Sequence, residues 1–420
     1  MSDDTTRGTV EAVFRIESPR LIASLTRLTR DVGRAEDLAQ DALVTALEQW
    51  PVQGVPENPA AWLMATAKHR AIDRFRRDAR AGRVHEEIGR DRAVFDTPAT
   101  MEATLDDDLG DDLLRLMFVA CHPVLPPEGR VALTLRLLGG LTTAEIARAY
   151  LVPEPTVAQR IVRAKRTLVA ERVPFEVPRG EERAGRLASV LETIYLMFNE
   201  GYAATSGGEW MRPELSEEAL RLGRVLTGLA PYEPEIHGLQ ALMELQASRF
   251  PARRAPDGAP ILLLDQNRAL WDPLLIRRGL AALDRAGQLA ESPGPYALQA
   301  AIAACHARAA DADATDWGRI VEGYDALLRI MPSPVVALNR AVAVGMASGP
   351  AAALPLVDAI VAERALASYH LLPSVRGDLL ERLGRRAEAR AEYERAAGLA
   401  GNARERGLLL DRATRCAARE

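Results

Sequence analysis

The sequence is poor in cysteine and in aromatic residues. Its 420 residues include only three cysteines, Cys121, Cys305 and Cys416, which stand far apart and form no CxxC or Cys/His pattern. We therefore expect reduced thiols, a cytoplasmic location and no metal site. Aromatic residues make up 5% of the chain and long alternating β-branched runs are missing, whereas Ala, Leu and Arg are abundant. This composition predicts an all-α fold, and the length predicts two or three domains.

Signals for a membrane or for catalysis are also missing. No stretch of about 18 uncharged apolar residues occurs, and residues 1–14 lack the basic-then-apolar pattern of an export signal. The sequence has no GxxxxGK[ST], GxSxG or HExxH motif, and its six histidines are isolated from candidate nucleophiles. We therefore expect no membrane association, no enzyme activity and no cofactor.

Charge is distributed unevenly, although the formal net charge is only −5. Residues 68–83 hold seven basic residues against two acidic ones, and residues 96–112 hold seven acidic residues and no basic one. Residues 141–168 are basic again. Two basic segments separated by an acidic connector indicate functions that are divided along the chain.

The N-terminal segment predicts helices over residues 8–50. In residues 34–50, one face carries only apolar residues at helical spacing: Ala35, Leu38, Ala39, Ala42 and Ala46. Asp37, Gln40 and Asp41 lie on the opposite face. Residues 51–60 are expected to form a loop, with Asn58 as the N-cap of a helix that starts at Pro59.

The helix after this loop is expected to bury Leu63, Met64, Ala67 and Ala71. Its other face forms a basic stripe with an aromatic residue at its start: Trp62, Thr66, His69, Arg70, Asp73, Arg76, Arg77 and Arg80. Aromatic rings can stack on bases that have left a duplex, while arginines hold phosphates. Trp62 could equally be a core anchor.

Residues 112–172 form a second small helical unit that ends in "LTTAEIARAYLVPEPTVAQRIVRAKRTL". Here Ile146 and Ala149 are expected to face the core, "VPEP" (152–155) makes a turn, and Pro155 begins the second helix. Its buried stripe is Val157, Ile161, Ala164 and Leu168. The outward side chains are Thr156, Gln159, Arg160 and Arg163, which could reach base edges, together with Lys165 and Arg166, which are placed to meet phosphates. The alternative is an ordinary solvated basic surface.

The remainder of the chain is predicted to be helical, and its last third repeats. Buried positions recur at intervals of 33 and 36 residues, in the sets Ile320, Tyr324, Leu327; Ala353, Val357, Ile360; and Ala389, Tyr393, Ala396. These intervals resemble tetratricopeptide-type helical hairpins, whose period is 34. Gly377 and Gly384 fall where helices must approach closely or turn.

Taken together, these motifs resemble an RNA polymerase sigma factor of the extracytoplasmic-function (ECF) type, a subgroup of the sigma-70 family. Residues 31–50 resemble the part of region 2 that docks on the clamp helices of RNA polymerase, which implies that Asp37, Gln40 and Asp41 are polymerase contacts. Residues 58–80 resemble the part that melts and holds the −10 promoter element. The resemblance implies these −10 contacts: Asn58, Trp62, Lys68, Arg70, Arg76 and Arg77.

The loop Pro51 to Asn58 sits where family members hold a flipped base. Residues 141–168 resemble region 4, which reads the −35 element as duplex DNA. The contacts implied there are Thr156, Gln159, Arg160, Arg163, Lys165 and Arg166. The expected partners are promoter DNA and the clamp helices and flap of the polymerase core. Many family members carry Asn where His69 stands, so the −10 preference could differ.

The resemblance divides the chain into region 2 (8–92), an acidic linker (93–112), region 4 (113–173), a helical extension (180–295) and tetratricopeptide-like repeats (296–420). The linker would thread a basic polymerase channel, or else is a solvated connector. The extension resembles an ECF subgroup in which a long helical domain modulates the sigma factor in cis. It could bind a protein partner or dock on the sigma regions.

Within the extension, "NEGYAATSGG" (199–208) could be a ligand loop in which Glu200 and Tyr202 are recognition groups, although such residues more often cap and pack. Two other classes of protein compete with the sigma-factor interpretation. A one-component repressor or activator would bind duplex DNA alone, usually as a dimer. A helical-repeat scaffold would have basic surfaces with no dependence on DNA.

Overall fold

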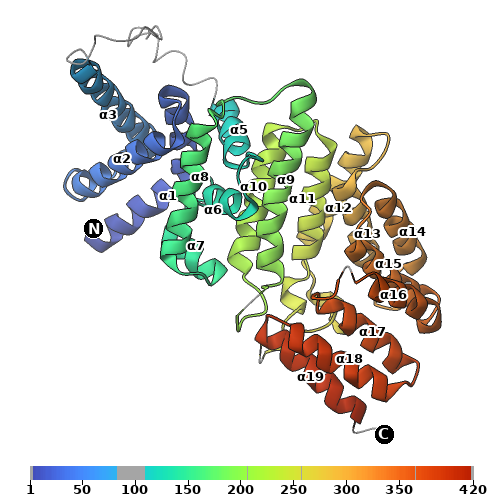
Figure 1. Ribbon diagram of the computed structural model, residues 1–420. Helices are drawn as coiled ribbons and strands as arrows, with labels where there is room; N and C mark the ends of the chain where they lie inside the picture. Colours follow the sequence, from blue (N-terminus) through green and yellow to red (C-terminus); the bar gives the residue numbers. More distant parts are fainter. Residues whose placement is uncertain (1–2, 83–108, 206, 257, 365, 418–420) are drawn as a thin grey trace. The chain divides into compact units, whose positions relative to one another are not determined.

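The computed structural model describes residues 3–82, 109–205, 207–256, 258–364 and 366–417; for 3–7, 11, 74–82 and 109–110 it describes the backbone alone (Figure 1). Apart from two isolated bridges, every regular element in these residues is helical, so the predicted all-α fold is confirmed. The chain divides into two compact units, Met1–Ile194 and Tyr195–Glu420, which are described separately below. Among the described residues, no helix is both long enough and apolar enough to cross a bilayer.

Unit 1 begins with three helices that pack on one another. They are α1 (Asp3–Thr29), α2 (Val32–Gln53) and α3 (Pro59–Gly82). The carboxylate of Asp31 caps α2 by accepting from the backbone N–H of Gly33 and Arg34. All five apolar positions predicted for α2 are buried, because their helical spacing places them on one face. On α3, Leu63, Ala67 and Ala71 are buried as predicted, whereas Met64 is only half-buried.

The predicted loop over residues 51–60 is too long. Helix α2 continues through Pro51 to Gln53, and Gly54, at φ +85°, then donates its N–H to Trp50 and ends the helix. Proline has a helical φ and removes only one hydrogen bond in the last turn, so it does not stop α2 there. Glycine tolerates the positive φ that ends it.

The second part of unit 1 contains four further helices and the start of a fifth. They are α5 (Leu109–Ala120), α6 (Pro127–Leu137), α7 (Thr143–Tyr150), α8 (Glu154–Ala170) and α9 (Gly180–Tyr202). The first half of α9 is tied to this unit. Arg186 donates to the carbonyl of Phe118 at 3.1 Å, and the Ser189 hydroxyl donates to the carbonyl of Cys121 at 2.5 Å. Arg130 in turn donates to Ser189.

Unit 2 continues from the second half of α9 as a series of helices joined by short connections. They are α10 (Pro213–Leu229), α11 (Pro234–Ala247), α12 (Pro273–Leu289), α13 (Pro295–Arg308), α14 (Trp317–Ile330), α15 (Pro334–Ala347), α16 (Pro350–Glu363), α17 (Leu371–Arg382), α18 (Arg386–Leu399) and α19 (Ala403–Ala417). Three 3₁₀ turns, η1 (Phe250–Ala252), η2 (Leu263–Asp265) and η3 (Arg268–Leu270), lie between α11 and α12.

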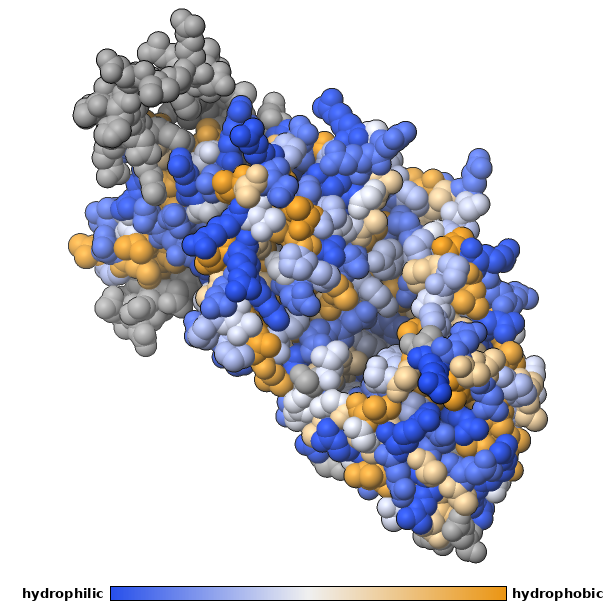
Figure 2. Space-filling view, in the orientation of Figure 1, coloured by the Kyte–Doolittle hydropathy of each residue, from blue (hydrophilic) through white to orange (hydrophobic). Residues whose placement is uncertain are grey.

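From α13 onward, successive helices pack as antiparallel hairpins (Figure 1). The repeated positions lie on α14, α16 and α18, and all of them are buried except Tyr324, which is half-buried. A Cβ at Gly377 would meet the Tyr393 ring at 2.9 Å, and Gly384 has φ +77°, which confirms the predicted close approach and turn. Hydrophilic side chains cover most of the face of these hairpins seen in Figure 2, with small hydrophobic patches between them.

Candidate nucleic-acid interface

Helices α7 and α8 form the predicted helix-turn-helix. The Thr142 hydroxyl accepts from the N–H of Glu145 at 3.1 Å, and the Glu145 carboxylate accepts from the N–H of Thr142 at 2.8 Å, a reciprocal capping box. Leu151 ends α7 in the left-handed region at φ 51°. Ile146 is buried as predicted, but its buried partner is Ala147 rather than Ala149, because the short helix presents its 146–147 edge to the core.

Helix α8 starts one residue earlier than predicted, at Glu154, with Pro153 as its N-cap. Pro155 therefore occupies the second helical position, where a missing N–H also costs nothing because the first turn has no intrahelical acceptors. The buried stripe is the predicted one: Val157, Ile161, Ala164 and Leu168. It packs on α6 and α7, so the orientation of α8 is fixed by its apolar face.

The opposite face of α8 points its polar side chains to solvent. Gln159, Arg163 and Arg166 are exposed, while Thr156 and Arg160 are half-buried. Within the part of the chain that the structure describes, no ion pair engages the guanidinium groups of Arg160, Arg163 or Arg166. These cations are therefore available for an external anionic partner.

Lys165 is engaged differently, because it forms an ion pair with Glu36 of α2. Glu36 is only 6% exposed and also accepts from Arg136 of α6 at 2.6 Å. One buried carboxylate thus joins α2 to both α6 and α8. The sequence pattern gave no sign of this, since Glu36 lies 100 residues from Arg136 and a single sequence carries no information on such pairs.

Two more ion pairs link the first three helices to those that follow. Arg15 of α1 donates to Glu145 at 2.8 Å. Partial burial opposes ionisation of Glu145, but the hydrogen bonds from Thr142 and the charge of Arg15 outweigh it, so the pKa of this carboxyl is lowered. Asp112 of α5, 1% exposed, lies 3.3 Å from Arg27 of α1 and 2.7 Å from Arg115. Unit 1 is therefore closed by charged side chains as well as by apolar ones.

The three polymerase contacts predicted on α2 lie together on its exposed side. Asp37, Gln40 and Asp41 all have exposed side chains. Arg70 of α3, predicted to contact DNA, donates to the Thr45 hydroxyl at 2.6 Å and lies 3.8 Å from Asp41. The structure thus brings one residue of each predicted surface together.

The start of α3 holds the predicted aromatic residue. Asn58 accepts from the N–H of Ala61 at 3.1 Å, which confirms it as the N-cap. Trp62 is half-buried and meets buried Trp50 edge to face, with ring centroids 5.4 Å apart, so it combines a packing contact with an accessible surface. Lys68 is half-buried and His69 is exposed. The side chains of Arg76, Arg77 and Arg80 lie outside the described residues.

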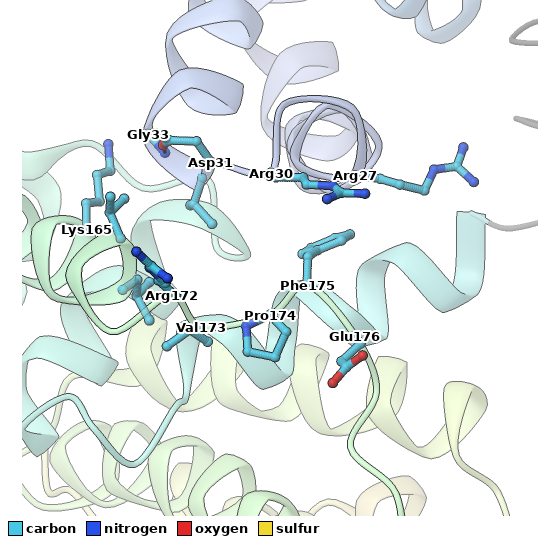
Figure 3. Close-up of a pocket in the computed structure, with 13 residues that line it drawn as sticks. Arg27, Arg30, Asp31, Gly33, Lys165, Arg172, Val173, Pro174, Phe175 and Glu176 are labelled. Carbon is cyan, nitrogen blue, oxygen red and sulfur yellow. Dashed lines mark hydrogen bonds between the residues drawn. The ribbon is translucent and has the colours of Figure 1, made fainter. Parts of the chain in front are cut away.

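A groove of about 690 Å³ lies between the α1–α2 turn and the end of α8 (Figure 3). Basic residues from both sides line it: Arg27, Arg30, Lys165 and Arg172. Phe175, from the connector that follows α8, lies beside the end of α1 (Figure 3). Sequence reasoning did not anticipate the groove, because it exists only when the two halves of unit 1 are in contact.

Comparison with known proteins matches this architecture part by part. Residues 13–81 match Sigma-70 region 2, and residues 115–168 match Sigma-70, region 4. Residues 186–287 match a family of unknown function (DUF6596). An uncharacterized protein of Rhizobium meliloti (strain 1021) is 45% identical over 96% of this chain and 94% of its own length.

Two ECF sigma factors each match about a third of the chain. The ECF RNA polymerase sigma factor SigL of Mycobacterium tuberculosis (strain ATCC 25618 / H37Rv) is 32% identical over 34% of this chain and 76% of its own length. The ECF RNA polymerase sigma factor SigC of Mycobacterium tuberculosis (strain CDC 1551 / Oshkosh) is 29% identical over 35% of this chain and 75% of its own length. The chain belongs to the ECF family of RNA polymerase sigma factors and carries a long helical extension, as the resemblance predicted.

Proposed function

We propose that this chain binds the RNA polymerase core in the cytoplasm and directs promoter recognition and the start of transcription. The observation that carries this proposal is helix α8, whose apolar face is packed and whose outward guanidinium groups have no partner in the described part of unit 1. The same chain also carries the α2–α3 surface. Sigma factors as a family are not enzymes, and the role proposed here is recognition without catalysis.

Helix α8 is proposed to read the −35 element in the major groove of closed duplex DNA. Thr156, Gln159, Arg160 and Arg163 stand on the side that faces away from α6 and α7. Each good bidentate contact to a base edge is worth about 1–3 kcal/mol of discrimination. Arg166 is proposed to bind phosphate without regard to sequence, and Lys165 could join it only after leaving Glu36.

The start of α3 is proposed to hold the −10 element after its strands part. The Trp62 ring is partly accessible and is held edge to face by Trp50. A base of any identity can stack on such a ring. The remaining contacts proposed for this element are Asn58, Lys68, Arg70, Arg76 and Arg77. Arg70 would have to exchange the Asp41 carboxylate for a phosphate.

The acidic side of α2 is proposed to dock on the clamp helices of the polymerase. Asp37, Gln40 and Asp41 are exposed together there. If Asp41 turns to the polymerase, Arg70 loses its carboxylate partner at 3.8 Å and keeps only the neutral Thr45 hydroxyl, so its charge becomes available to a DNA phosphate. Docking on the polymerase and gripping of the −10 strand would then be coupled through one ion pair.

Unit 1 is also proposed to open when it engages a promoter. Elements named −35 and −10 lie roughly 25 base pairs apart, about 85 Å at 3.4 Å per base pair. In the structure, Lys165 of α8 touches Glu36 of α2, so the two DNA-binding surfaces belong to one packed unit. The polymerase would separate them and hold them at promoter spacing, so that two weak contacts act together.

The C-terminal extension is proposed to regulate this activity in cis. Its hairpins form a stacked helical array of the kind that binds protein segments. A protein partner or an intramolecular dock on the sigma regions would each serve. Residues 93–108 of the acidic linker, which is proposed to enter the polymerase channel, lie outside the described residues, whereas residues 109–112 form the first turn of α5.

The function is tested by run-off transcription with purified polymerase core on a promoter selected by the full chain. We expect transcripts only when core and chain are both present, and co-purification of the two. Specific duplex binding by the chain alone, unchanged by added core, would indicate a one-component regulator instead. Activity independent of DNA would indicate a scaffold.

A further inference from the structure

An arginine cluster in unit 2 has no place in the sigma-factor function. Arg249, Arg253 and Arg268 all lie in the connector between α11 and α12. The guanidinium carbon of Arg253 stands 3.4 Å from the ring centroid of Tyr202 and 5.6 Å from that of Trp210. Those of Arg249 and Arg268 stand 5.5 and 4.9 Å from the ring of Trp271. We call these three arginines with the three rings the arginine cluster.

Among the residues that the structure describes, no carboxylate is paired directly with the arginine cluster. Within the described residues, no carboxylate oxygen lies within 4.0 Å of the side-chain nitrogens of Arg249, Arg253 or Arg268. Arg249 donates only to the amides of Gln246 and Gln266, at 3.1 and 3.2 Å. Arg268 donates to the carbonyls of His306 and Ala309 and to the Thr315 hydroxyl. Neutral acceptors therefore orient these two cations. Burial lowers the pKa of Arg268, and the charge of Asp311, which lies beyond ion-pair distance, offsets this only in part.

Arg253 is the most extreme of the three. It is only 4% exposed, and its Nη1 has no hydrogen-bond partner. Burial lowers its pKa to about 10, and Arg249 adds to this while Tyr202 opposes it, so the group remains a cation at neutral pH. Apart from the aromatic rings of Tyr202 and Trp210, this buried charge has no partner in the described part of the chain. Such a charge is costly to bury, and groups perturbed in this way are concentrated at functional sites.

The geometry also indicates which part of a ligand the cluster would recognise. Guanidinium groups lie over the rings of Tyr202 and Trp271, and the ring of Phe198 also stacks on Tyr202, so less of either ring is left for stacking on an aromatic ligand. The in-plane N–H groups of a stacked arginine point sideways and match a planar or tetrahedral oxyanion. Arg249, Arg268, Tyr202 and Trp210 are each partly exposed, so solvent reaches the edge of the cluster.

We propose that the arginine cluster binds a small oxyanion, namely a phosphate or a carboxylate group carried by a small molecule. Arg253 donates to this group through its unpartnered Nη1, and Arg249 and Arg268 supply the remaining positive charge around it. Five of the cluster's six members come from residues after the sigma regions and outside the "NEGYAATSGG" loop. Within that loop, Tyr202 serves as a platform for Arg253, whereas Glu200 is held by Arg212 and Thr205. All six lie within the segment matched to the family of unknown function.

The test uses the full chain and two probes, inorganic phosphate and succinate, at matched ionic strength against chloride. Thermal unfolding and isothermal titration calorimetry are measured for the wild type, Arg253→Met and Arg278→Met. Arg278 is an exposed arginine of α12 in the same unit, so its replacement changes the net charge equally. We expect saturable stabilisation of the wild type and of Arg278→Met by one probe, and binding at least about tenfold weaker in Arg253→Met. Response to phosphate alone or to succinate alone assigns the ligand's anionic group.

The unfolding temperature without ligand distinguishes a binding role of Arg253 from a purely structural one. Methionine keeps much of the arginine's packing on Tyr202 but removes the unbalanced charge, so Arg253→Met should unfold at a higher temperature than the wild type without ligand, by about 2 °C or more. Arg253→Lys keeps the charge but loses the planar set of guanidinium N–H donors, so it should also bind at least about tenfold more weakly. The proposal is overturned if neither probe gives saturable stabilisation, if Arg253→Met binds like the wild type, or if its ligand-free unfolding temperature falls.

Discussion

Glu36 is the residue on which the closed form of unit 1 depends most. Its carboxylate is buried and holds Arg136 and Lys165 from two other helices. Removing one partner of a buried ion pair costs about 3–5 kcal/mol, because the remaining charges are left unbalanced. We therefore expect Glu36→Gln to lower the free energy of unfolding of unit 1 by about 3 kcal/mol in urea denaturation.

A matched control is Asp41→Asn on the same helix, where the carboxylate is half-exposed and its ion pair is 3.8 Å long. This change should cost less than about 1 kcal/mol. Glu36→Gln should also release Lys165 and so strengthen binding of the free chain to non-specific duplex DNA at low salt. Equal destabilisation by the two changes would contradict a special role for Glu36.

His306 makes unit 2 sensitive to acid. Burial, with Arg249 and Arg268 nearby, lowers its pKa to about 4. The imidazole is therefore protonated near pH 6.5 in the unfolded chain but only near pH 4 in the folded chain. Folding stability is lost as the pH falls through this window. We expect His306→Gln to reduce the loss between pH 7 and pH 5 by about 1–2 kcal/mol, measured by urea denaturation at both values. Identical pH slopes for variant and wild type would rule this out.

Trp62 is predicted to support strand separation rather than duplex binding. Trp62→Ala removes the accessible ring beside Trp50, so we expect weaker promoter melting by about 1–3 kcal/mol per stacked base, seen as lower permanganate reactivity. Trp62→Phe keeps an aromatic platform and should retain most of the melting. If Trp62→Ala melts the promoter like the wild type, the stacking role is wrong.

At the residue scale, the sequence predicted the features that depend on spacing along one helix. It did not predict contacts between residues that are far apart in the chain. The buried face of α2 and the cap at Asn58 follow from spacing along one helix. The pairs that Glu36 and Asp112 form with other helices depend on the tertiary fold. The arginine cluster escaped for the same reason, since its aromatic and basic members are scattered from 202 to 271.

Among the elements, α8 is the one whose proposed role is most directly testable. Arg160→Ala removes an outward side chain beyond the buried stripe, so we expect a loss of about 1–3 kcal/mol on a promoter with an intact −35 element. Gln159→Ala should act in the same direction. Both are measured as promoter binding by the reconstituted holoenzyme.

Arg166→Ala is the control for this prediction, because Arg166 lies on the same helix and is proposed to meet phosphate. It should weaken binding by a similar factor whether or not the −35 sequence is altered, and it should lower the salt dependence. If Arg160→Ala showed that uniform behaviour too, α8 would hold the backbone without reading bases.

Element boundaries show where local sequence signals compete. Proline was expected to end α2 at Pro51 and to begin α8 at Pro155, yet each lies inside its helix. Pro155 lies in the first turn of α8, where an N–H has no intrahelical acceptor, and Pro51 lies in the last turn of α2, where only one hydrogen bond is lost. Glycine with a positive φ marked the true end of α2. The helical type of the elements was nevertheless predictable, from composition and from the apolar period of helices such as α2, α3 and α8, whereas the individual helices of residues 180–295 were not.

For the whole molecule, α9 joins the sigma regions to the extension, and its first half stabilises unit 1. Arg186, Ser189 and their partners Phe118 and Cys121 all lie within residues 1–194. No sequence signal placed residues 180–194 with the preceding unit, since the loop at 174–180 looked like a boundary. The position of a truncation therefore decides whether the extension alone is removed or unit 1 is damaged as well.

We expect a chain ending at residue 194 to fold and to start transcription at the same promoter sequence as the full chain, but in a different amount, because the proposed regulatory domain is gone while α8 and α3 are unchanged. A chain ending at residue 179 also loses the bonds of Arg186 and Ser189. The bond from the charged Arg186 is worth about 1.5–3 kcal/mol and that from the neutral Ser189 hydroxyl about 0.5–1.5 kcal/mol. The chain ending at 179 should therefore unfold at lower urea than the chain ending at 194. Run-off transcription on a library of promoter variants measures both the amount of transcript and the promoter sequence preference. A changed sequence preference in the chain ending at 194 would show that the extension takes part in reading DNA rather than in regulating transcription.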